Sequence, residues 1–478
     1  MVSKEFRSLD RFILTLFCRP APFRQSAGEG DGRGDRRVLL RCNGSRAGRW
    51  LVLAGLTVAF RLQAAAVECE TLELPGNYRE DGLWSALYAA KNGMVYIGAQ
   101  AHGGETNFYQ YDPKKKAVRH VANMMKLAGE HGLGIRGQAK IHTRFVEDEN
   151  GIIYFGTGNC GSGPWNIDPR TWGGGHWWAY DPARDAVEHL GLVDRGFSDL
   201  YGLAIDRVRH RLYATAWNGH LYILDLRTRI TTDAGRVSNW DVCRTIETDD
   251  QGNCYGTSDR QQMFKYDAAA DRLLDLPVVI PHDPYQWPQN YGRPRLDRKN
   301  IWRVAEWSER AKGIYLIEGG ASYLSRYDPR QGPHGTVEFL AQMGAPAFSG
   351  SHNLPYSTLS MVIGRDHRIY FAPGGSVFDY GFDSEDGGAD GEIASYLVAY
   401  DPERRQRADY GALVEKKTGR KVLGTQGAAC GPDGTLYFFG AVEEPDAKKA
   451  LPEKVLGRAP FILKLIMVDP RSLVSRSK

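Results

Sequence analysis

Residues 149–158 read ENGIIYFGTG, and after an interruption residues 177–182 read WWAYDP. A turn with Gly leads into a short strand that carries an aromatic residue, and a second strand ends at Asp181-Pro182. Gly permits the positive φ of a tight turn. Pro fixes φ, and Asp accepts backbone hydrogen bonds. The segment therefore predicts two short antiparallel strands, each closed by a tight turn.

The same pattern occurs seven times in the chain, and the six other copies lie on both sides of this one. They are found at residues 91–113, 209–225, 251–267, 312–329, 367–402 and 433–470. Each unit is predicted to have four strands, the first as in residues 141–148 and the last as in residues 186–193. Repeats of about 40 residues with period-two alternation are typical of propeller blades. Because one such blade cannot cover both of its faces, the blades must pack around an axis. We therefore predict an all-β fold, a seven-bladed β-propeller, over residues 67–473.

The two ends of the chain predict how the ring closes. The last copy has a strand at residues 461–468 but little chain beyond it for an outer strand. Residues 67–74, VECETLEL, precede the first copy and belong to no unit of their own. We expect this N-terminal strand to complete the last blade, because closure removes an exposed sheet edge.

Residues 1–66 are predicted to be an N-terminal extension with a secretory signal peptide. A basic stretch at residues 37–49 precedes the apolar run WLVLAGLTVAF at residues 50–60, and Ala64 to Ala66 follow. A basic flank, a short apolar stretch and small residues at a cleavage site are typical of a signal peptide. The run is too short for an ordinary membrane-spanning helix, although a membrane anchor and a buried helix are the alternatives. We expect a secreted or periplasmic protein with no stable membrane insertion after cleavage.

Composition excludes some classes of function. The net charge of +4 is too small to indicate nucleic-acid binding. The seven cysteines show no CxxC pair and no zinc-finger spacing. Cys243 and Cys254 are expected on neighbouring strands. A disulfide between them and two buried free thiols are the two alternatives.

The candidate site is predicted from the longest connections between the second and third strands of a unit. They span residues 158–175, 374–393 and 441–460, and all three open on one face of a propeller. Long loops on a rigid scaffold commonly carry function. The innermost strands begin at the same face, so the side chains at their entries are expected to line one mouth of the channel. These entries include His142, Arg144, Tyr201, Cys243, Arg244, Trp302, Arg303 and Gln426, with His352 and Tyr356 just before the sixth unit.

Other aromatic and basic residues are expected at that mouth. The approach to the fifth unit carries Trp287 and Tyr291, and His176 begins a strand of the second unit. Aromatic faces suit sugar rings, and Arg suits carboxylates and sulfates. Arg144, Arg244 and Arg303 have a structural alternative, which is pairing with buried acidic residues, and His142 and Tyr201 can be channel lining or core. The acidic loop at residues 379–392 has a composition suited to a divalent metal such as Ca or Zn, although a solvated loop is the simpler interpretation.

The repeat with its long loops resembles the exported bacterial seven-bladed propellers, and among them the propeller polysaccharide lyases such as ulvan lyases. That resemblance implies a His and a Tyr at the mouth and an Arg on the uronate carboxylate, at positions matched here by His142, Tyr201 and Arg144, with Arg244 or Arg303 as alternatives to Arg144. The reaction would be β-elimination on an anionic, uronate-containing polysaccharide or oligosaccharide. The residues expected to bind substrate are Arg244, Trp302, Arg303, His352, Tyr356, Tyr291, Trp287 and His176.

Two other classes of function remain open from the sequence. A non-catalytic propeller that binds a glycan or a protein would use the same aromatic and basic residues. A quinone- or metal-dependent oxidoreductase is disfavoured, because no cluster of acidic and Asn residues and no vicinal Cys pair is evident. The absence of a carboxylate pair among the entries also disfavours an ordinary glycosidase. No cofactor is required by these interpretations, and a monomer is expected.

Overall fold

The computed structural model describes residues 66–474, except 77, 79, 102–104, 134–135, 160–172, 197, 240–242, 259–261, 281–301, 319–321, 345–358, 374–393 and 447–459. The predicted signal peptide, the acidic loop, Trp287, Tyr291, His352 and Tyr356 lie outside the described residues. Within the described part, no helix is long and apolar enough to cross a membrane.

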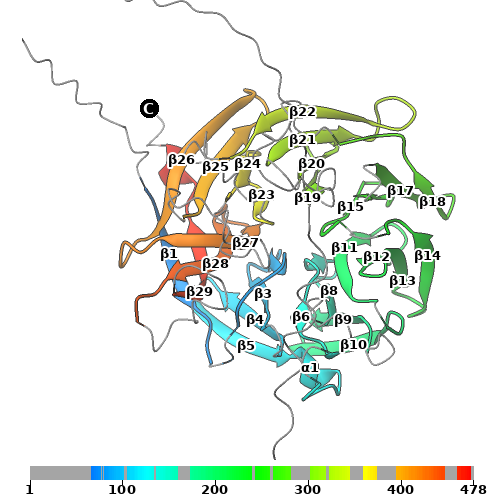
Figure 1. Cartoon of the computed structure of the whole chain (residues 1–478), viewed down its shortest axis with the longest axis horizontal. Helices are drawn as coiled ribbons and strands as arrows, with labels where there is room; N and C mark the ends of the chain where they lie inside the picture. Colours follow the sequence, from blue (N-terminus) through cyan, green and yellow to red (C-terminus); the bar gives the residue numbers. More distant parts are fainter. Residues whose placement is uncertain are drawn as a thin grey trace, which may run out of the picture. The chain divides into compact units, whose positions relative to one another are not determined.

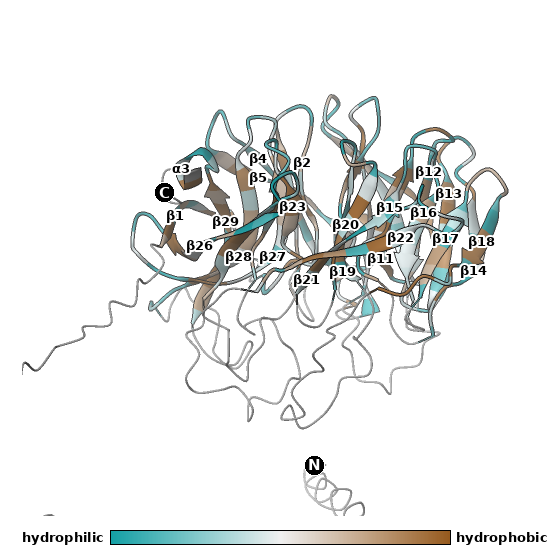
Figure 2. Ribbon diagram, turned by 90° about the horizontal axis from the view of Figure 1, so that it is seen from above, coloured by the Kyte–Doolittle hydropathy of each residue, from teal (hydrophilic) through white to brown (hydrophobic). Residues whose placement is uncertain are grey.

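The described part is built from five sheets of four or five strands and one sheet of eight strands, arranged as a propeller (Figure 1). The first strand of each small sheet lies nearest the common axis, and the last lies at the periphery. Figure 2 shows the same sheets standing side by side around that axis when the view is turned by 90°. The prediction of an all-β propeller is confirmed at this level.

The small sheets are arranged in the order of the chain. The first contains β2 (Leu87–Ala89), β3 (Val95–Ala99), β4 (Asn107–Asp112) and β5 (Ala117–Asn123). The second contains β6 (Lys140–Ile141), β7 (Val146–Glu147), β8 (Ile153–Gly158), β9 (His176–Asp181) and β10 (Ala186–Leu192). The third contains β11 (Leu200–Asp206), β12 (Arg211–Ala216), β13 (His220–Asp225) and β14 (Thr231–Arg236). The fourth contains β15 (Glu247–Thr248), β16 (Cys254–Thr257), β17 (Met263–Asp267) and β18 (Arg272–Asp275). The fifth contains β19 (Trp302–Ser308), β20 (Gly313–Glu318), β21 (Tyr323–Asp328) and β22 (Thr336–Gln342).

The eight-stranded sheet joins both ends of the described chain. Its order is β23 (Met361–Ile363), β24 (Ile369–Phe371), β25 (Tyr396–Asp401), β26 (Gln406–Glu415), β1 (Val67–Glu73), β29 (Phe461–Val468), β28 (Leu436–Glu443) and β27 (Val422–Cys430). Strand β1 pairs antiparallel with β29, as predicted for the N-terminal strand. It also pairs parallel with β26, which the repeat pattern did not predict. Two short helices complete the described elements, α1 (Met124–Leu127) and α3 (Arg471–Val474).

The Asp of the repeat forms the turn that the sequence predicted. Asp181 Oδ1 accepts hydrogen bonds from the backbone N–H groups of Ala183 and Arg184, two and three residues later. Asp112 and Asp401 accept from the equivalent positions of their own turns. The residue four places after each of these Asp residues then adopts a positive φ, as in Asp185 at 50°. Because the Asp side chain closes the turn by itself, Pro is not required at the next position in every copy.

The aromatic positions of the repeat pack one sheet against the next. Tyr96 of β3 meets Tyr180 of β9, with ring centroids 5.6 Å apart in an edge-on arrangement. The same pairing joins the third sheet to the fourth, the fourth to the fifth, and β28 to the first. Edge-on and offset aromatic pairs are favourable beyond the area that they bury. The Tyr after the Gly turn of one sheet therefore contacts the Tyr before the Asp of the next sheet.

The described cysteines are free thiols. Cys69, Cys243 and Cys254 are buried, and Cys430 is half-buried. Of the two possibilities left open for Cys243 and Cys254, the structure has two buried thiols and no disulfide. Burial, together with the neighbouring Cys243, raises the pKa of the Cys254 thiol, so this group is not a reactive thiolate.

Candidate functional site at the channel axis

Three innermost strands carry a β-bulge at equivalent positions of the repeat. Tyr201 is left out of the pairing of β11 with β12, Arg303 out of the pairing of β19 with β20, and Gln426 out of the pairing of β27 with β28. A bulge leaves its extra residue unpaired and redirects its side chain. The bulges therefore set these three side chains apart from the regular alternation of their strands. All three positions were among the strand entries predicted from the sequence.

His142 lies in the gap between β6 and β7, and it contacts residues from two other sheets. Its ring centroid is 3.9 Å from that of Tyr201, with the planes at 46°. Arg244 Nη1 lies 3.1 Å from His142 Nε2, and Arg244 Cζ lies 4.4 Å from the Tyr201 ring centroid. Three side chains from three consecutive sheets therefore converge, which the sequence could suggest only by their equivalent places in the repeat.

The contact between Arg244 and His142 defines a protonation state. A guanidinium has only donors, so His142 Nε2 must accept this hydrogen bond. The imidazole is then neutral, with its proton on Nδ1. Arg244 in turn places positive charge over the face of Tyr201, a favourable cation–π arrangement.

Trp84 and Lys140 complete the group, and neither was predicted from the sequence to belong to the site. Trp84 is half-buried, and its ring lies 5.4 Å from Lys140 Nζ, 5.7 Å from Arg303 Cζ and 5.9 Å from the His142 ring. Lys140 could have been found from its period-two spacing with His142. Trp84 could have been found from the repeat, because it precedes the turn residue Gly93 by nine positions, as His142 precedes Gly151. The axial cluster is defined as Trp84, Lys140, His142, Tyr201, Arg244 and Arg303.

The axial cluster is basic and aromatic. Trp217 extends it by stacking on Tyr201, with ring centroids 5.2 Å apart and planes at 28°. Among the described residues, no carboxylate forms an ion pair with Arg244. Positive groups within a cleft attract an anionic ligand even where the net charge is small. The cluster is thus suited to an anionic ligand with an apolar face.

Arg144 contacts groups outside the axial cluster. Its guanidinium donates to Glu247 and to the backbone carbonyl of Ala305. The carboxylate of Glu306 lies close to the same ion pair and accepts from the backbone N–H of Ile363 at 3.0 Å. The structural alternative for Arg144, pairing with a buried acid, is therefore the observed arrangement. Arg244, rather than Arg144, makes the contacts with His142 and Tyr201.

Removal of Arg144 is expected to affect stability rather than ligand binding. In Arg144→Met, Glu247 loses its cation inside the channel, and breaking such a pair destabilises by about 3 kcal/mol. The double variant Arg144→Met/Glu247→Leu should recover most of this loss, because no uncompensated charge remains. Denaturant unfolding of the two variants measures the difference. Equal destabilisation by both variants would contradict this account of the pair.

Glu306 predicts a pH dependence of stability. Burial raises the pKa of its carboxyl to about 8, Glu247 adds to the rise, and Arg144 opposes it. The folded pKa lies above the unfolded value of 4.5, so the stabilising contribution is complete below about pH 4.5 and is lost as the pH rises to about 8. Glu306→Gln, which resembles the protonated acid, should flatten this decline in the free energy of unfolding. An unchanged slope between wild type and variant would show that Glu306 does not titrate there.

Two further predicted residues lie away from the axial cluster. Trp302 is fully buried, and its Nε1 donates to the Thr245 carbonyl at 2.6 Å, so it packs the fourth sheet against the fifth. His176 Nδ1 lies 2.8 Å from His189 Nε2, and His176 Nε2 lies 3.3 Å from Glu130. Within the described residues neither side chain contacts the axial cluster. Their predicted role in substrate binding stays a prediction.

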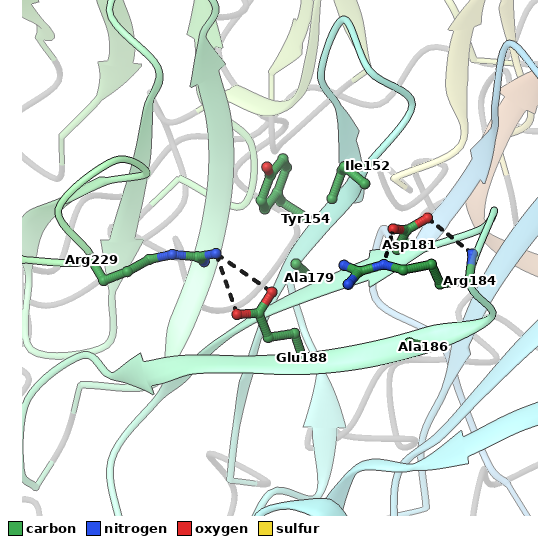
Figure 3. A pocket seen from close by; sticks show the side chains of 8 residues that line it. All are labelled: Ile152, Tyr154, Ala179, Asp181, Arg184, Ala186, Glu188 and Arg229. Atoms are coloured by element: carbon green, nitrogen blue, oxygen red, sulfur yellow. Dashed lines mark hydrogen bonds and ion pairs between the residues drawn. The ribbon is translucent and has the colours of Figure 1, made fainter.

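A surface cavity of about 320 Å³ lies between the second and third sheets (Figure 3). It is near the end of β9 at Asp181, opposite the end at which the long loops leave the sheet. Both of its cations are engaged: Arg229 pairs with Glu188 at 3.3 Å, and Arg184 pairs with Asp181 at 2.5 Å. Both cations of the cavity are already paired with carboxylates, so the cavity is less suited to an anionic ligand than the axial cluster.

Nothing in the described ranges forms a group of three or more His, Cys, Asp or Glu side chains arranged to hold a metal ion. The loop at residues 379–392, where a metal was considered, is not among the residues described. The prediction of a structural metal is therefore untested.

The fold defines a β-propeller, and comparison with known proteins agrees with that class. Neither a protein-family model nor a curated protein sequence matches the chain. Virginiamycin B lyase from Staphylococcus aureus is 7% identical, with a TM-score of 0.51 over 84% of this chain and 99% of that one. The RRP9 WD40 repeats are 9% identical, with a TM-score of 0.51 over 85% of this chain and 99% of that one. At such identities the likeness concerns the fold alone.

Proposed function

We propose that the chain is a seven-bladed propeller in which the eight-stranded sheet represents two blades. The halves β23 to β26 and β27 to β29 with β1 each repeat the four-strand order of the small sheets. Parallel pairing of β1 with β26 joins the two halves, which would otherwise be separate sheets. With the five small sheets, this makes seven units, in agreement with the seven copies of the repeat.

We further propose that this propeller is a secreted or periplasmic polysaccharide lyase. Its substrate would be an anionic, uronate-containing polysaccharide, cleaved by β-elimination. The observation that carries the proposal is the contact of His142, Tyr201 and Arg244 across three sheets. Virginiamycin B lyase, by its name, is a lyase on the same fold, which makes a lyase compatible with a propeller without indicating the substrate.

The chemistry assigns a separate task to each of these side chains. Arg244 neutralises the uronate carboxylate, which acidifies the proton at C5. The Tyr201 phenolate removes that proton, the C4–O4 bond breaks, and a C4=C5 double bond forms. The resulting phenol returns the proton to O4, so atoms and charge balance. The guanidinium over the Tyr201 ring stabilises the phenolate, and His142 Nε2 holds Arg244 in place.

A non-catalytic propeller that binds an anionic glycan is the second candidate. His142 and Tyr201 are only 3% and 1% exposed, which suits a packed support beneath a binding surface. In that case the half-buried residues Trp84 and Arg244 would contact the glycan, and no bond would be broken.

The test is incubation of the full chain with a panel of uronate-containing polysaccharides. Lyase activity is expected to produce ultraviolet absorbance from a double bond conjugated to the carboxylate. Arg244→Met should abolish this signal, whereas Arg229→Met, in the turn between β13 and β14 of the third sheet, should leave it unchanged. Binding of a polysaccharide without any new absorbance would reject the lyase in favour of the binding protein. Neither binding nor absorbance over the panel would reject both.

A further inference from the structure

The third sheet lacks one aromatic residue that the repeat places between sheets. Leu224 precedes the repeat Asp there, whereas Tyr, such as Tyr180, precedes it in five of the other six copies. Tyr180 contacts Tyr96 of the first sheet, with ring centroids 5.6 Å apart. Tyr154 of the second sheet stands at the repeat position of Tyr96, and it shares a hydrophobic cluster with Leu224. Because leucine is shorter than tyrosine and has no hydroxyl, it fills the junction of the second and third sheets less completely.

The surface cavity of about 320 Å³ lies at this junction, and Tyr154 is part of its lining (Figure 3). The apolar part of the lining consists of Ile152, Tyr154, Ala179 and Ala186. The Tyr154 hydroxyl donates to Asp148 at 3.2 Å, so the ring rather than the hydroxyl is left for a ligand. Pockets for small ligands have volumes of about 300–1,000 Å³. The cavity therefore has room for one small molecule and not for several sugar rings.

An ion pair crosses the same junction, and its equivalent elsewhere in the ring is tighter. Glu188 of β10 lies 3.3 Å from the nearest nitrogen of Arg229. Glu338 and Arg405 form the equivalent pair between the fifth sheet and the eight-stranded sheet, at 2.7 Å, where Tyr400 precedes the repeat Asp. Charge-assisted N–H···O bonds are commonly about 2.7–2.9 Å long. The carboxylate of Glu188 is therefore weakly bonded, and it can accept from a ligand.

The cations of the cavity also keep unused donors. Figure 3 shows the guanidinium groups of Arg184 and Arg229 approaching the cavity from opposite sides. Arg184 bonds to Asp181 through Nε, and within the described part of the chain its two terminal nitrogens make no hydrogen bond. Asp181 is occupied by that bond and by two backbone N–H groups of its own turn. The groups open to a ligand are therefore the terminal nitrogens of Arg184 and the carboxylate of Glu188.

We propose that this cavity binds a free α-amino acid with an apolar side chain. The ligand carboxylate accepts from Arg184, and the ligand ammonium donates to Glu188. The apolar side chain packs on Ile152 and Tyr154. Two cations and two carboxylates line the cavity, so a ligand of one sign is repelled by two of them, whereas a zwitterion complements both signs. No residue of the axial cluster lines the cavity, so this inference does not depend on the proposed lyase.

The experiment titrates the full chain at neutral pH with L-leucine, N-acetyl-leucine and leucinamide, using calorimetry. The three probes share one side chain, but N-acetyl-leucine has no ammonium and leucinamide has no carboxylate. Leucine is expected to bind about tenfold more tightly than either blocked probe, because each of these loses one charge-assisted hydrogen bond.

Matched variants assign the contacts. Glu188→Gln should weaken the binding of leucine about tenfold and leave that of N-acetyl-leucine unchanged, since this probe has no ammonium. Glu338→Gln removes the equivalent carboxylate of the fifth sheet, away from the cavity, and should leave the binding of both probes unchanged. Leu224→Tyr should abolish binding of all three probes, because the larger side chain restores the repeat and fills the cavity.

The results either support or overturn the amino-acid site. Leucine that binds no more tightly than both blocked probes overturns it, as does an unchanged affinity for leucine in Glu188→Gln. If wild type binds no probe at millimolar concentration and Leu224→Tyr only raises the melting temperature, the cavity is a packing defect and the proposal fails. Where Leu224→Tyr does not fold, the comparison of Glu188→Gln with Glu338→Gln decides alone.

Discussion

Tyr201→Phe is expected to lower turnover roughly a thousandfold while leaving the affinity for polysaccharide nearly unchanged. The substitution removes only the phenol oxygen, which in the proposed reaction accepts the C5 proton and returns it to O4. The ring remains to stack on Trp217 and to face Arg244. The loss should therefore appear in kcat and not in KM, because the interaction is made only in the transition state.

Tyr266→Phe is the matched control for this prediction. Tyr266 is also buried, but its hydroxyl donates to Asp271 at the turn end of the fourth sheet, away from the axial cluster. It should lose some stability and keep full turnover. Kinetics on the cleaved polysaccharide and a binding isotherm for each variant decide the matter. A Tyr201→Phe protein that retains turnover would remove Tyr201 from the chemistry and leave His142 as the remaining base.

Much of the fold could be predicted because the repeat encodes contacts that are local or periodic. The Asp turn is closed by hydrogen bonds two and three residues away, as at Asp181. The two aromatic positions meet in adjacent sheets, as Tyr96 and Tyr180 do. The pairing of β1 with β29 was predicted by counting strands. The parallel pairing of β1 with β26 could not be predicted, because it joins two sheets that each look complete in sequence.

The sequence predicted which residues converge at the candidate site, but it did not predict that Arg144 would be paired elsewhere. Position in the repeat identified Tyr201, Arg244 and His142, which do converge. The same reasoning treated Arg144 as equivalent, although it lies two residues farther along the strand and meets Glu247. Glu247 lies with Arg144, whereas the buried acids Asp81 and Asp199 lie three residues before Trp84 and two residues before Tyr201. Trp84 stands at the repeat position of His142, but its contact with Arg303 of the fifth sheet is between units that are not consecutive, so only the folded ring shows it.

Loss of strand β1 is expected to have the largest effect on the fold. A chain that begins at Leu74 lacks residues 67–73, and should lose cooperative folding or form oligomers through the exposed edges. Strand β1 pairs with β29 at four positions and with β26 at three, and Val67 and Cys69 are buried. Each hydrogen bond contributes about 1 kcal/mol and a buried Val about 2 kcal/mol. The sum approaches the net stability of about 5–15 kcal/mol that is typical of a folded protein.

The control for this truncation is a chain that begins at Val67, which removes the predicted signal peptide and keeps β1. It should unfold in one transition and remain monomeric. The shorter chain leaves β26 and β29 as two unpaired edges, and such edges pair with other molecules. A synthetic peptide of residues 67–73 should restore part of its solubility, because the peptide refills the gap between them. Size-exclusion chromatography and thermal unfolding distinguish the two chains. If the chain from Leu74 were monomeric and as stable as the control, β26 and β29 would have to close the sheet without β1.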